Sequence, residues 1–445
     1  MRWLLYIFTL VITSFYFFPF EFTFLPGMNT KMVIAGIGLV VLAFHFARRR
    51  EFKIDNDFLT ISAWALVVSL IGFAAVTYNN TNDYTYATYF VSMAVWLGAA
   101  YVVVKLMEKV HGEVNVDIVC NYLIVLCAVQ CLVAISMSYI PALKSFVDSF
   151  LAGQGFMGKM EDRLYGIGCS LDVAGTRFCA VLVMISEMLK RAVDKSLPKI
   201  TICLYLVAFL ILAVVGNMIA RTTTVGVILA VLYLIVRTRF FSVEGIKEYG
   251  SIWKTILISV VVFIPIIVLL YNVSPVFNAN FRFAFEGFFS LFETGEWEVH
   301  SNEILKNMVV FPDDIKTWLI GNGYFENPYY RDPYYIGPIF HGYYMQTDIG
   351  YCRFLFYFGI FGLLAFIAYF IKVGTTCMKR FPDYRMMFLA ILMVNFIVWC
   401  KVSSDIFLVF AIFLCIPFAD KGQYETSLHH PLPVQPGRDG EGAAE

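Results

Sequence analysis

The stretch that decides the fold is YCRFLFYFGIFGLLAFIAYFI, residues 351–371, which is apolar almost throughout and carries a single charge, Arg353. About 20 mostly apolar residues in a helix are enough to cross the ~30 Å hydrocarbon layer of a bilayer. The sequence therefore predicts a membrane helix here. Two further polar residues, His341 and Asp348, precede this helix, and a polar entrance to an apolar helix requires an explanation.

The whole chain shares this apolar character. Of its 445 residues 60% are hydrophobic, 17% are aromatic and only 15% are charged, and the mean hydropathy is +0.73. This composition is far from that of soluble domains and indicates a polytopic membrane protein. The net charge is zero, and no basic cluster suited to nucleic acid stands out, so we expect a lipid bilayer and no nucleic acid as partner.

Apolar runs of membrane-spanning length recur along the chain, and the predicted fold class is all-α with twelve membrane helices. The predicted helices are residues 3–20, 32–47, 58–77, 86–104, 117–140, 171–189, 200–218, 222–236, 255–271, 351–371, 386–399 and 405–418. The first is too long and too aromatic for a signal-peptide core, so we expect it to be retained. No soluble domain or internal repeat is evident.

Lys and Arg gather in alternate loops, which predicts the orientation of the chain by the positive-inside rule. The basic loops are residues 48–53, 105–109, 190–199, 237–254 and 372–385. Both termini are then cytoplasmic, and two long connections, about 141–170 and 272–350, lie outside. Residues 1–420 would form one membrane domain, and the polar residues 421–445 a disordered cytoplasmic tail.

The chain has ten cysteines, none of them in a CxxC pair. Seven lie in or beside apolar runs, and we expect them to be buried small hydrophobic residues: Cys120, Cys127, Cys131, Cys179, Cys203, Cys400 and Cys415. No metal-ligand spacing such as HExxH occurs. We therefore expect no cofactor and a metal-independent site.

Arg221 lies in VVGNMIARTTTVGVILA, residues 214–230, where two apolar runs follow each other closely. Gly216 and Gly226 flank a break of the kind found in discontinuous membrane helices, and Thr222 or Thr223 would cap the second helix. A helix N-terminus beside a guanidinium favours an anion such as phosphate. The alternative is an outer turn whose arginine extends to lipid headgroups.

Further cations occur at or beside the predicted outer connections. Arg177 lies in the predicted span SLDVAGTRFCAVL, and the loop cations are Lys144, Lys159, Arg163, Arg282, Lys306, Lys316 and Arg331. Each lysine is adequately explained as a solvated loop charge. Arg163 and Arg282 lie close to predicted helix ends, where they would reach a shared anion.

Aromatic residues crowd the same outer connection in GNGYFENPYYRDPYYIGPIFHGYYM, residues 321–345. Tyrosines such as Tyr343 and Tyr344 offer flat faces for sugar rings and hydroxyls for hydrogen bonds, which favours a carbohydrate cleft. An interfacial aromatic belt is the alternative for any single tyrosine. Residues 283–292, FAFEGFFSLF, are predicted to form one helix on the membrane surface.

His341 is the one histidine that stands beside Asp348 and Arg353. Its ordinary pKa near neutrality suits it to proton transfer, although a lone loop histidine more often has a structural role.

These features resemble the Wzy-type O-antigen and capsule polymerases of bacteria, within the superfamily that includes the O-antigen ligases. The resemblance rests on the span number, the break at Arg221, LIGNGYF at 319–325 and TDIGYCRFLFYFGIFG at 347–362. It implies a fold similar to the C-type glycosyltransferases. It also implies transfer of a glycan from undecaprenyl diphosphate to a sugar hydroxyl at the outer face of the inner membrane.

The resemblance assigns roles to the candidate residues. Arg221, with Arg353 or Arg282 as partner, would hold the diphosphate, and His341, oriented by Asp348, would accept the proton of the attacking hydroxyl. The other proposed substrate-binding residues are Arg163, Arg177, Arg331, Tyr343 and Tyr344. A chain-length regulator and a flippase are the protein partners that the resemblance suggests.

Two alternatives remain open. An O-antigen ligase would use the same donor and transfer the glycan to the lipid A core, and no sequence feature separates it from a polymerase. A flippase or transporter would carry ionisable residues near mid-membrane in two related halves, whereas here they concentrate on the predicted outer side.

Overall fold

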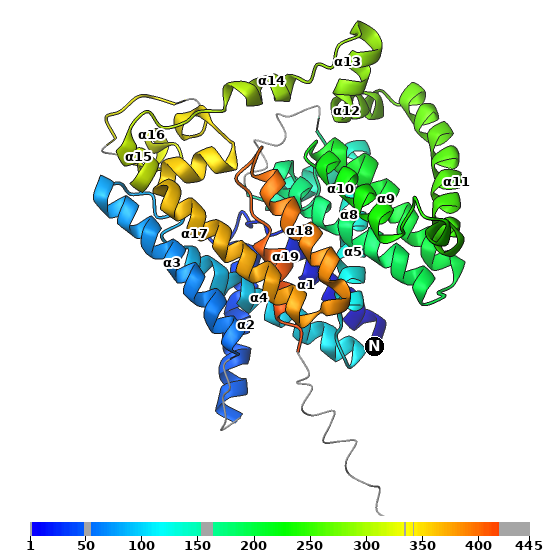
Figure 1. Cartoon of the computed structure of the whole chain (residues 1–445), viewed down its shortest axis with the longest axis horizontal. Helices are drawn as coiled ribbons and strands as arrows, with labels where there is room; N and C mark the ends of the chain where they lie inside the picture. Colours follow the sequence, from blue (N-terminus) through cyan, green and yellow to red (C-terminus); the bar gives the residue numbers. More distant parts are fainter. Residues whose placement is uncertain (1, 49–54, 153–162, 333–334, 341, 418–445) are drawn as a thin grey trace, which may run out of the picture.

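The computed structural model of the protein describes residues 2–48, 55–152, 163–332, 335–340 and 342–417 (Figure 1). Most of these residues are helical, and they contain no strand beyond two isolated bridges, Glu21–Asn29 and Phe22–Leu151. The predicted all-α class is therefore confirmed. The predicted tail, residues 421–445, lies outside the described residues.

Every predicted membrane segment overlaps a helix, although α19 covers only part of the segment predicted over residues 405–418. These helices are α1 (Arg2–Phe17), α2 (Thr30–Arg48), α3 (Asn56–Asn79), α4 (Tyr89–His111), α5 (Val116–Tyr139), α8 (Leu171–Asp194), α9 (Lys199–Ile219), α10 (Thr223–Arg237), α11 (Val243–Val273), α17 (Gly350–Arg380), α18 (Arg385–Val398) and α19 (Phe407–Leu414). Six of them, α3, α4, α5, α9, α11 and α17, are long and apolar enough to cross a membrane. The structure is thus compatible with a polytopic membrane protein.

The two long connections carry shorter helices, α12 to α16 along the upper edge of the molecule in Figure 1. The shorter elements are α6 (Pro141–Phe150), α12 (Pro275–Ala284), α13 (Glu286–Thr294), α14 (His300–Asn307), α15 (Ile315–Ile320), α16 (Pro328–Arg331), η1 (Tyr344–Gln346) and η2 (Pro382–Tyr384). The prediction that residues 283–292 form one continuous helix is wrong. The chain leaves the helical conformation at Phe285, and this break separates α12 from α13.

Helix α8 forms the centre of the bundle and packs against α5, α9, α10 and α18. Most of its residues are buried. Gly226 of α10 lies so close to Cys179 of α8 that an added Cβ would collide with the Cys179 Cα. The glycine that the sequence places beside the Arg221 break thus permits the tight packing of α10 on α8.

Helix α17 is broken inside the membrane-length segment, at Phe358 and Gly359. The carbonyl oxygens of Phe356 and Tyr357, which the break frees, accept hydrogen bonds from the backbone N–H groups of Asn322 (2.6 Å) and Gly323 (3.0 Å). The backbone of the LIGNGYF segment (residues 319–325) therefore packs into the break in α17. The TDIGYCRFLFYFGIFG segment (residues 347–362) contains the start of this helix and the break. The two segments that carry the resemblance are in direct contact.

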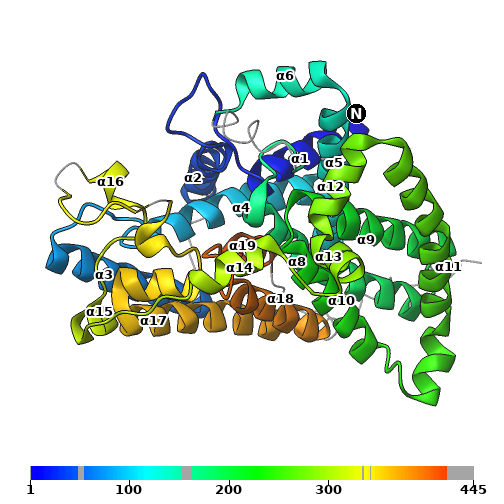
Figure 2. The same cartoon turned by 90° about the horizontal axis from the view of Figure 1, so that it is seen from above.

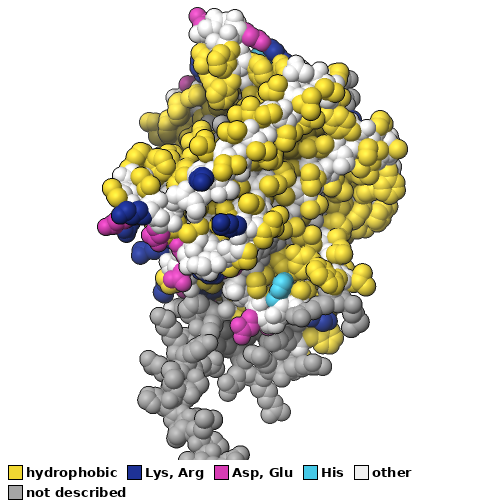
Figure 3. All heavy atoms as spheres, turned by 90° about the vertical axis from the view of Figure 1, so that its right-hand side faces the viewer, with side chains coloured by type: hydrophobic (Ala, Val, Ile, Leu, Met, Phe, Trp, Pro, Cys, Tyr) yellow, Lys and Arg dark blue, Asp and Glu magenta, His cyan; other side chains and the backbone are white. Residues whose placement is uncertain are grey.

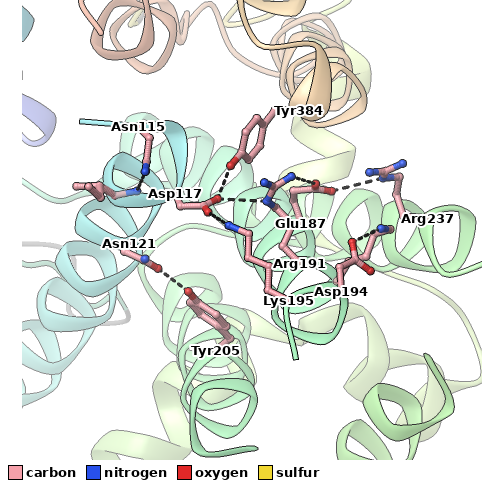
Figure 4. Close-up of polar contacts among 12 residues, drawn as sticks. Asn115, Asp117, Asn121, Glu187, Arg191, Asp194, Lys195, Tyr205, Arg237 and Tyr384 are labelled. Atoms are coloured by element: carbon pink, nitrogen blue, oxygen red, sulfur yellow. Dashed lines mark hydrogen bonds and ion pairs between the residues drawn. The ribbon is translucent and has the colours of Figure 1, made fainter. Parts of the chain in front are cut away.

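The C-terminal end of α8, which the loop charges predict to face the cytoplasm, carries a network of charged and polar side chains (Figure 4). The buried Glu187 carboxylate lies 3.9 Å from Arg191 and 3.4 Å from Arg237, and it accepts a hydrogen bond from the Tyr233 hydroxyl (2.6 Å). The Asp117 carboxylate of α5 pairs with Arg191 (3.3 Å). Lys195 of α8 and Tyr384 of η2 also donate hydrogen bonds to Asp117. We call these residues the inner network.

Helix α11 stands apart at one edge of the molecule (Figure 2). Its buried residues are confined to its first third, and the remainder exposes leucine, isoleucine and valine side chains. Figure 3 shows that this side of the molecule is almost continuously hydrophobic, with most charged side chains toward its edges. Such a large apolar face is expected of a surface in contact with lipid.

All ten cysteines are free thiols, and most are buried. Cys203 and Cys400 are exposed, so the prediction that they are buried is wrong. Both lie in apolar segments, and a lipid-facing position has the same apolar composition as a buried one, which is why the sequence did not separate them.

Candidate functional site

The break predicted at Arg221 is present. Helix α9 ends at Ile219, Ala220 is extended, and α10 begins at Thr223, so Arg221 lies in a tight turn between two helices. The predicted cap is wrong. Thr222 makes no cap hydrogen bond to the helix backbone, because its hydroxyl donates to the Asp172 carboxylate instead.

Arg221 and Arg163 lie against the same aromatic ring. The guanidinium carbons of Arg221 and Arg163 are 4.3 Å and 4.7 Å from the centre of the Phe283 ring in α12. Arg221 also pairs with Glu286, the first residue of α13. The break after α12 therefore places one aromatic ring and one carboxylate beside the turn of Arg221.

Arg163 lies within electrostatic reach of both Asp172 and Arg221. Burial lowers the pKa of the Arg163 guanidinium from its usual value, Asp172 opposes this shift, and the charge of Arg221 adds to it to a smaller extent. Among the described residues Arg163 has a ring contact but no ion pair. An anion held between Arg163 and Arg221 would relieve the repulsion between the two guanidinium groups.

Lys401 bonds to Asp172 and to the turn of Arg221, in a loop that the positive-inside rule predicts to face outward. Its ammonium group lies 3.1 Å from the Asp172 carboxylate and donates to the Thr222 hydroxyl at 2.8 Å. Asp172 begins the first turn of α8, and Lys401 precedes α19. We call Arg163, Asp172, Arg221, Glu286 and Lys401 the outer cluster.

Arg353 is buried, and its two terminal nitrogens are bonded to protein, whereas its Nε has no hydrogen-bond partner among the described residues. One guanidinium nitrogen, Nη1, donates to the Ser403 hydroxyl (2.6 Å) and lies 3.4 Å from Asp348, and the other, Nη2, donates to the Phe325 carbonyl (2.9 Å). The group is also stacked between the rings of Phe325 (3.7 Å) and Tyr343 (4.3 Å). With both terminal nitrogens bonded to protein, Arg353 is arranged to order the chain around it.

Asp348 pairs with Arg353 and is influenced by the charges of the outer cluster. Burial raises the pKa of its carboxyl group from 3.8 to about 6, and the charge of Arg353 limits this rise. Asp172 raises and Lys401 lowers the same pKa, which shows that Asp348 lies within electrostatic reach of the outer cluster. A carboxyl group with this pKa can exchange a proton close to neutral pH.

The two tyrosines predicted to bind substrate have different surroundings. Tyr343 is exposed and covers the Arg353 guanidinium. Tyr344 accepts a hydrogen bond from the side-chain amide of Asn322 (3.1 Å), and burial raises the pKa of its phenol to about 12. Tyr343 therefore faces the polar site, whereas Tyr344 supports LIGNGYF.

Two of the predicted arginines have other surroundings. Arg282 donates to both oxygens of Glu293 (2.8 Å each) and to Tyr271, so it links α12 to α11 and α13. Arg177 is buried inside the bundle, where Asp405 and Lys31 are its charged neighbours, and its Nε has no hydrogen-bond partner among the described residues.

The structure does not test the predicted roles of Arg331 and His341. The Arg331 backbone ends α16, but its side chain lies outside the described part of the chain. His341 also lies outside the described residues. Their proposed roles in substrate binding and proton transfer stay predictions.

Sequence reasoning missed Asp172, Glu286 and Lys401. One signal for Lys401 was present, because it is a single cation in a loop that the positive-inside rule places outside. An acidic residue in the first turn of an apolar helix would have drawn attention to Asp172 in the same way. Glu286 gave no signal, because it stood inside a segment predicted to be one surface helix.

Among the described residues no group of three or more His, Cys, Asp or Glu side chains could hold a metal ion. No protein-family model matches the chain, and no curated protein or solved structure matches it. The function therefore has to be argued from the site itself and from the resemblance in its motifs.

Proposed function

We propose that the chain is a polysaccharide polymerase that transfers a glycan from a polyprenyl-diphosphate carrier to a sugar hydroxyl at the outer face of the bacterial inner membrane. The observation that carries the proposal is the contact of Arg163 and Arg221 with one aromatic ring. Two guanidinium groups held close together suit a diphosphate, because each offers a planar fork of donors to phosphate oxygens.

The arginine pair differs from the pairs expected from the sequence. Arg282 is held by Glu293 and Arg353 by Ser403 and Phe325, so Arg163 is the better-placed partner of Arg221. Glu286 pairs with Arg221 in the free protein. In the proposal the diphosphate displaces this carboxylate when the donor binds.

The reaction needs charge stabilisation and one proton transfer. The bond between the anomeric carbon and the diphosphate oxygen breaks, a glycosidic bond to the acceptor oxygen forms, and the hydroxyl proton passes to a base. Arg163, Arg221 and Lys401 would stabilise the charge that grows on the leaving diphosphate. His341 is the predicted base, and Asp348, with its pKa of about 6, is a second group suited to this step.

The proposal includes the membrane arrangement. Twelve helices would cross the inner membrane with both termini in the cytoplasm, on a fold similar to the C-type glycosyltransferases. What supports this is that all twelve apolar segments are helical and that α11 presents an extensive apolar face. The donor tail would lie in lipid while its sugars reach the aqueous loops.

The test is reconstitution of the purified protein in liposomes with undecaprenyl-diphosphate-linked oligosaccharide. A ladder of lengthened lipid-linked glycans is expected from the wild type, and Arg221→Lys should lose about 10²–10³-fold in rate, because a single ammonium replaces the fork. The matched control is Arg385→Lys, an exposed residue at the start of α18.

Two outcomes would contradict the proposal. Transfer of the glycan to a lipid A core acceptor without any lengthening would make the protein a ligase. Movement of the intact donor between leaflets without new glycosidic bonds would make it a transporter. If Arg221→Lys lengthens glycans as fast as the wild type, the arginine pair does not take part in the reaction.

A further inference from the structure

A polar cavity of about 500 Å³ opens in the outer connections, separate from the outer cluster. Its lining comes from the turn after α3, from the residue that follows GNG, and from the loop after α16. The lining residues are Asn80, Asn82, Tyr324, Asp332, Tyr335, Ile336 and Gly337. We call this cavity the amide pocket.

The walls of the amide pocket are organised by hydrogen bonds. The buried Asp332 carboxylate accepts from the Asn82 amide (3.3 Å) and from the Tyr324 hydroxyl (2.9 Å). The rings of Tyr324 and Tyr335 meet edge to face at 5.6 Å, and the Tyr335 hydroxyl donates to the Pro338 carbonyl (2.9 Å). The pocket is therefore preformed, with its two tyrosine rings fixed in place.

We infer that the amide pocket binds an uncharged pyranose ring of the acceptor glycan. Side-chain amides both donate and accept hydrogen bonds, which matches the vicinal hydroxyl groups of a sugar. The tyrosine rings and the fully exposed Ile336 offer apolar surface to the C–H face of the ring. None of the described residues that line the pocket is a lysine or arginine, so the carboxylate of a uronic acid finds no cation there, which favours a neutral sugar.

A second cavity has a different chemistry. The cavity among α8, α9, α10 and α11 is lined by leucine, valine, isoleucine, phenylalanine and tryptophan, with only Ser186 and Ser259 as polar exceptions. Such walls suit a lipid chain and give a sugar hydroxyl almost no partner. The amide pocket has the reverse composition, which favours a glycan.

The amide pocket adjoins the segment that packs on Arg353. Tyr324 lines the pocket, and the next residue, Phe325, stacks on Arg353 and accepts its hydrogen bond. Asp83 fixes this peptide segment by accepting from the Phe325 N–H (2.8 Å). Identifying the sugar as part of the acceptor rests on the proposed function, whereas binding of a neutral sugar does not.

The test measures binding of free methyl glycosides to the purified full chain in nanodiscs by saturation-transfer NMR. The probes are the methyl glycosides of glucose, galactose and N-acetylglucosamine, with methyl glucuronide as the charged comparison. At least one neutral glycoside should bind at least several-fold more tightly than the glucuronide.

Two variants test the walls of the pocket. Asn80 has a left-handed backbone (φ 52°), so Asn80→Gly removes the amide and leaves a residue that adopts this conformation easily. Asn82→Ala removes the second amide. Each should weaken binding of the neutral glycoside about three- to tenfold, which is the value of one hydrogen bond. The matched control is Asn302→Ala, an exposed position in α14, with no expected change.

The experiments distinguish a failure of the amide-pocket inference from a failure of the proposed polymerase function. Arg221→Lys should bind the neutral glycoside like the wild type even though it no longer lengthens glycans. Three results would overturn the inference that the amide pocket binds a neutral sugar. The first is an unchanged affinity in both Asn80→Gly and Asn82→Ala. The others are tighter binding of the glucuronide than of the neutral glycosides, and binding of no glycoside. A melting temperature equal to that of the wild type shows that each variant is folded.

Discussion

The inner network and the outer cluster are both made of arginine, lysine and carboxylate side chains, yet they are built differently. In the inner network Arg191 and Arg237 both pair with the single buried Glu187, and Asp117 joins α5 to α8 (Figure 4). In the outer cluster Arg163 has only a ring contact among the residues that the structure describes, and the turn of Arg221 meets a partly exposed carboxylate, Glu286.

The comparison shows how the same residue types serve structure or function. Charges paired across rigid helices at one end of a bundle fix the positions of those helices. Cations gathered on turns and loops, one of which has no ion pair within the described part of the chain, leave charge to be neutralised by a ligand. Changes in the inner network should therefore reduce the amount of folded protein, and changes in the outer cluster should reduce activity.

The largest effect is expected in the inner network. Glu187→Ala leaves Arg191, Arg237 and Tyr233 without their shared carboxylate, and breaking a buried pair of this kind costs about 3–5 kcal/mol. The protein level in the membrane should fall strongly. The control is Glu108→Ala, which removes an exposed pair with Lys105 and should cost less than about 1 kcal/mol. Equal levels for the two variants would contradict the structural role of the inner network.

Arg353 tests the distinction between a residue that stabilises the fold and a residue that binds the donor. Arg353→Ala removes the hydrogen bonds to Ser403 and Phe325 and the stack with Tyr343, and leaving such buried groups unpaired costs about 1–3 kcal/mol. The membrane level should fall, and the surviving protein should bind donor with nearly wild-type affinity. A normal level combined with weak donor binding would instead make Arg353 a ligand of the diphosphate.

The pKa of Asp348 predicts opposite pH dependences for stability and activity. Because burial raises this pKa from 3.8 to about 6, the folded state favours the protonated form. The free energy of unfolding should therefore fall as the pH rises from about 4 to about 6 and stay lower above that. Turnover should rise over the upper part of this range as the carboxylate forms.

The control is Asp348→Asn, in which both changes should disappear. The charged groups that face this carboxyl are Arg353, Asp172 and Lys401, with the Tyr343 phenol beside it. Thermal unfolding and initial rates, each measured from pH 4.5 to 7.5, provide the test. A turnover profile unchanged in Asp348→Asn would assign the proton transfer to another group.

The smallest effect is expected at Arg282. Its pair with Glu293 is exposed, and exposed pairs contribute about 0–1 kcal/mol. Arg282→Ala should leave donor binding unchanged and lower the melting temperature only slightly. A loss of donor affinity of tenfold or more would show that Arg282 contributes to donor binding. It would weaken the proposal that Arg163 is the partner of Arg221 in binding the diphosphate.

The helices and the break at Arg221 could be predicted because their signals are local. A run of apolar residues, a glycine on each side of a break and a polar turn are each visible within about 20 residues. The pairs of the outer cluster could not be predicted, because Asp172 and Lys401 are separated by 229 positions. The kink at Phe358 and Gly359 was missed because its freed carbonyls are satisfied by LIGNGYF, a segment far away in sequence.

The central claim is that Arg163 and Arg221 hold one diphosphate together. The most direct measurement is the affinity of purified wild type, Arg163→Lys, Arg221→Lys and the double variant for undecaprenyl diphosphate and for undecaprenyl monophosphate. Each single variant should lose about tenfold in affinity for the diphosphate, and the double variant clearly less than the product of the two losses, because the two residues share one ligand. Losses for the monophosphate should be smaller. Unchanged affinity for the diphosphate, or independent losses of equal size for both lipids, would contradict the claim.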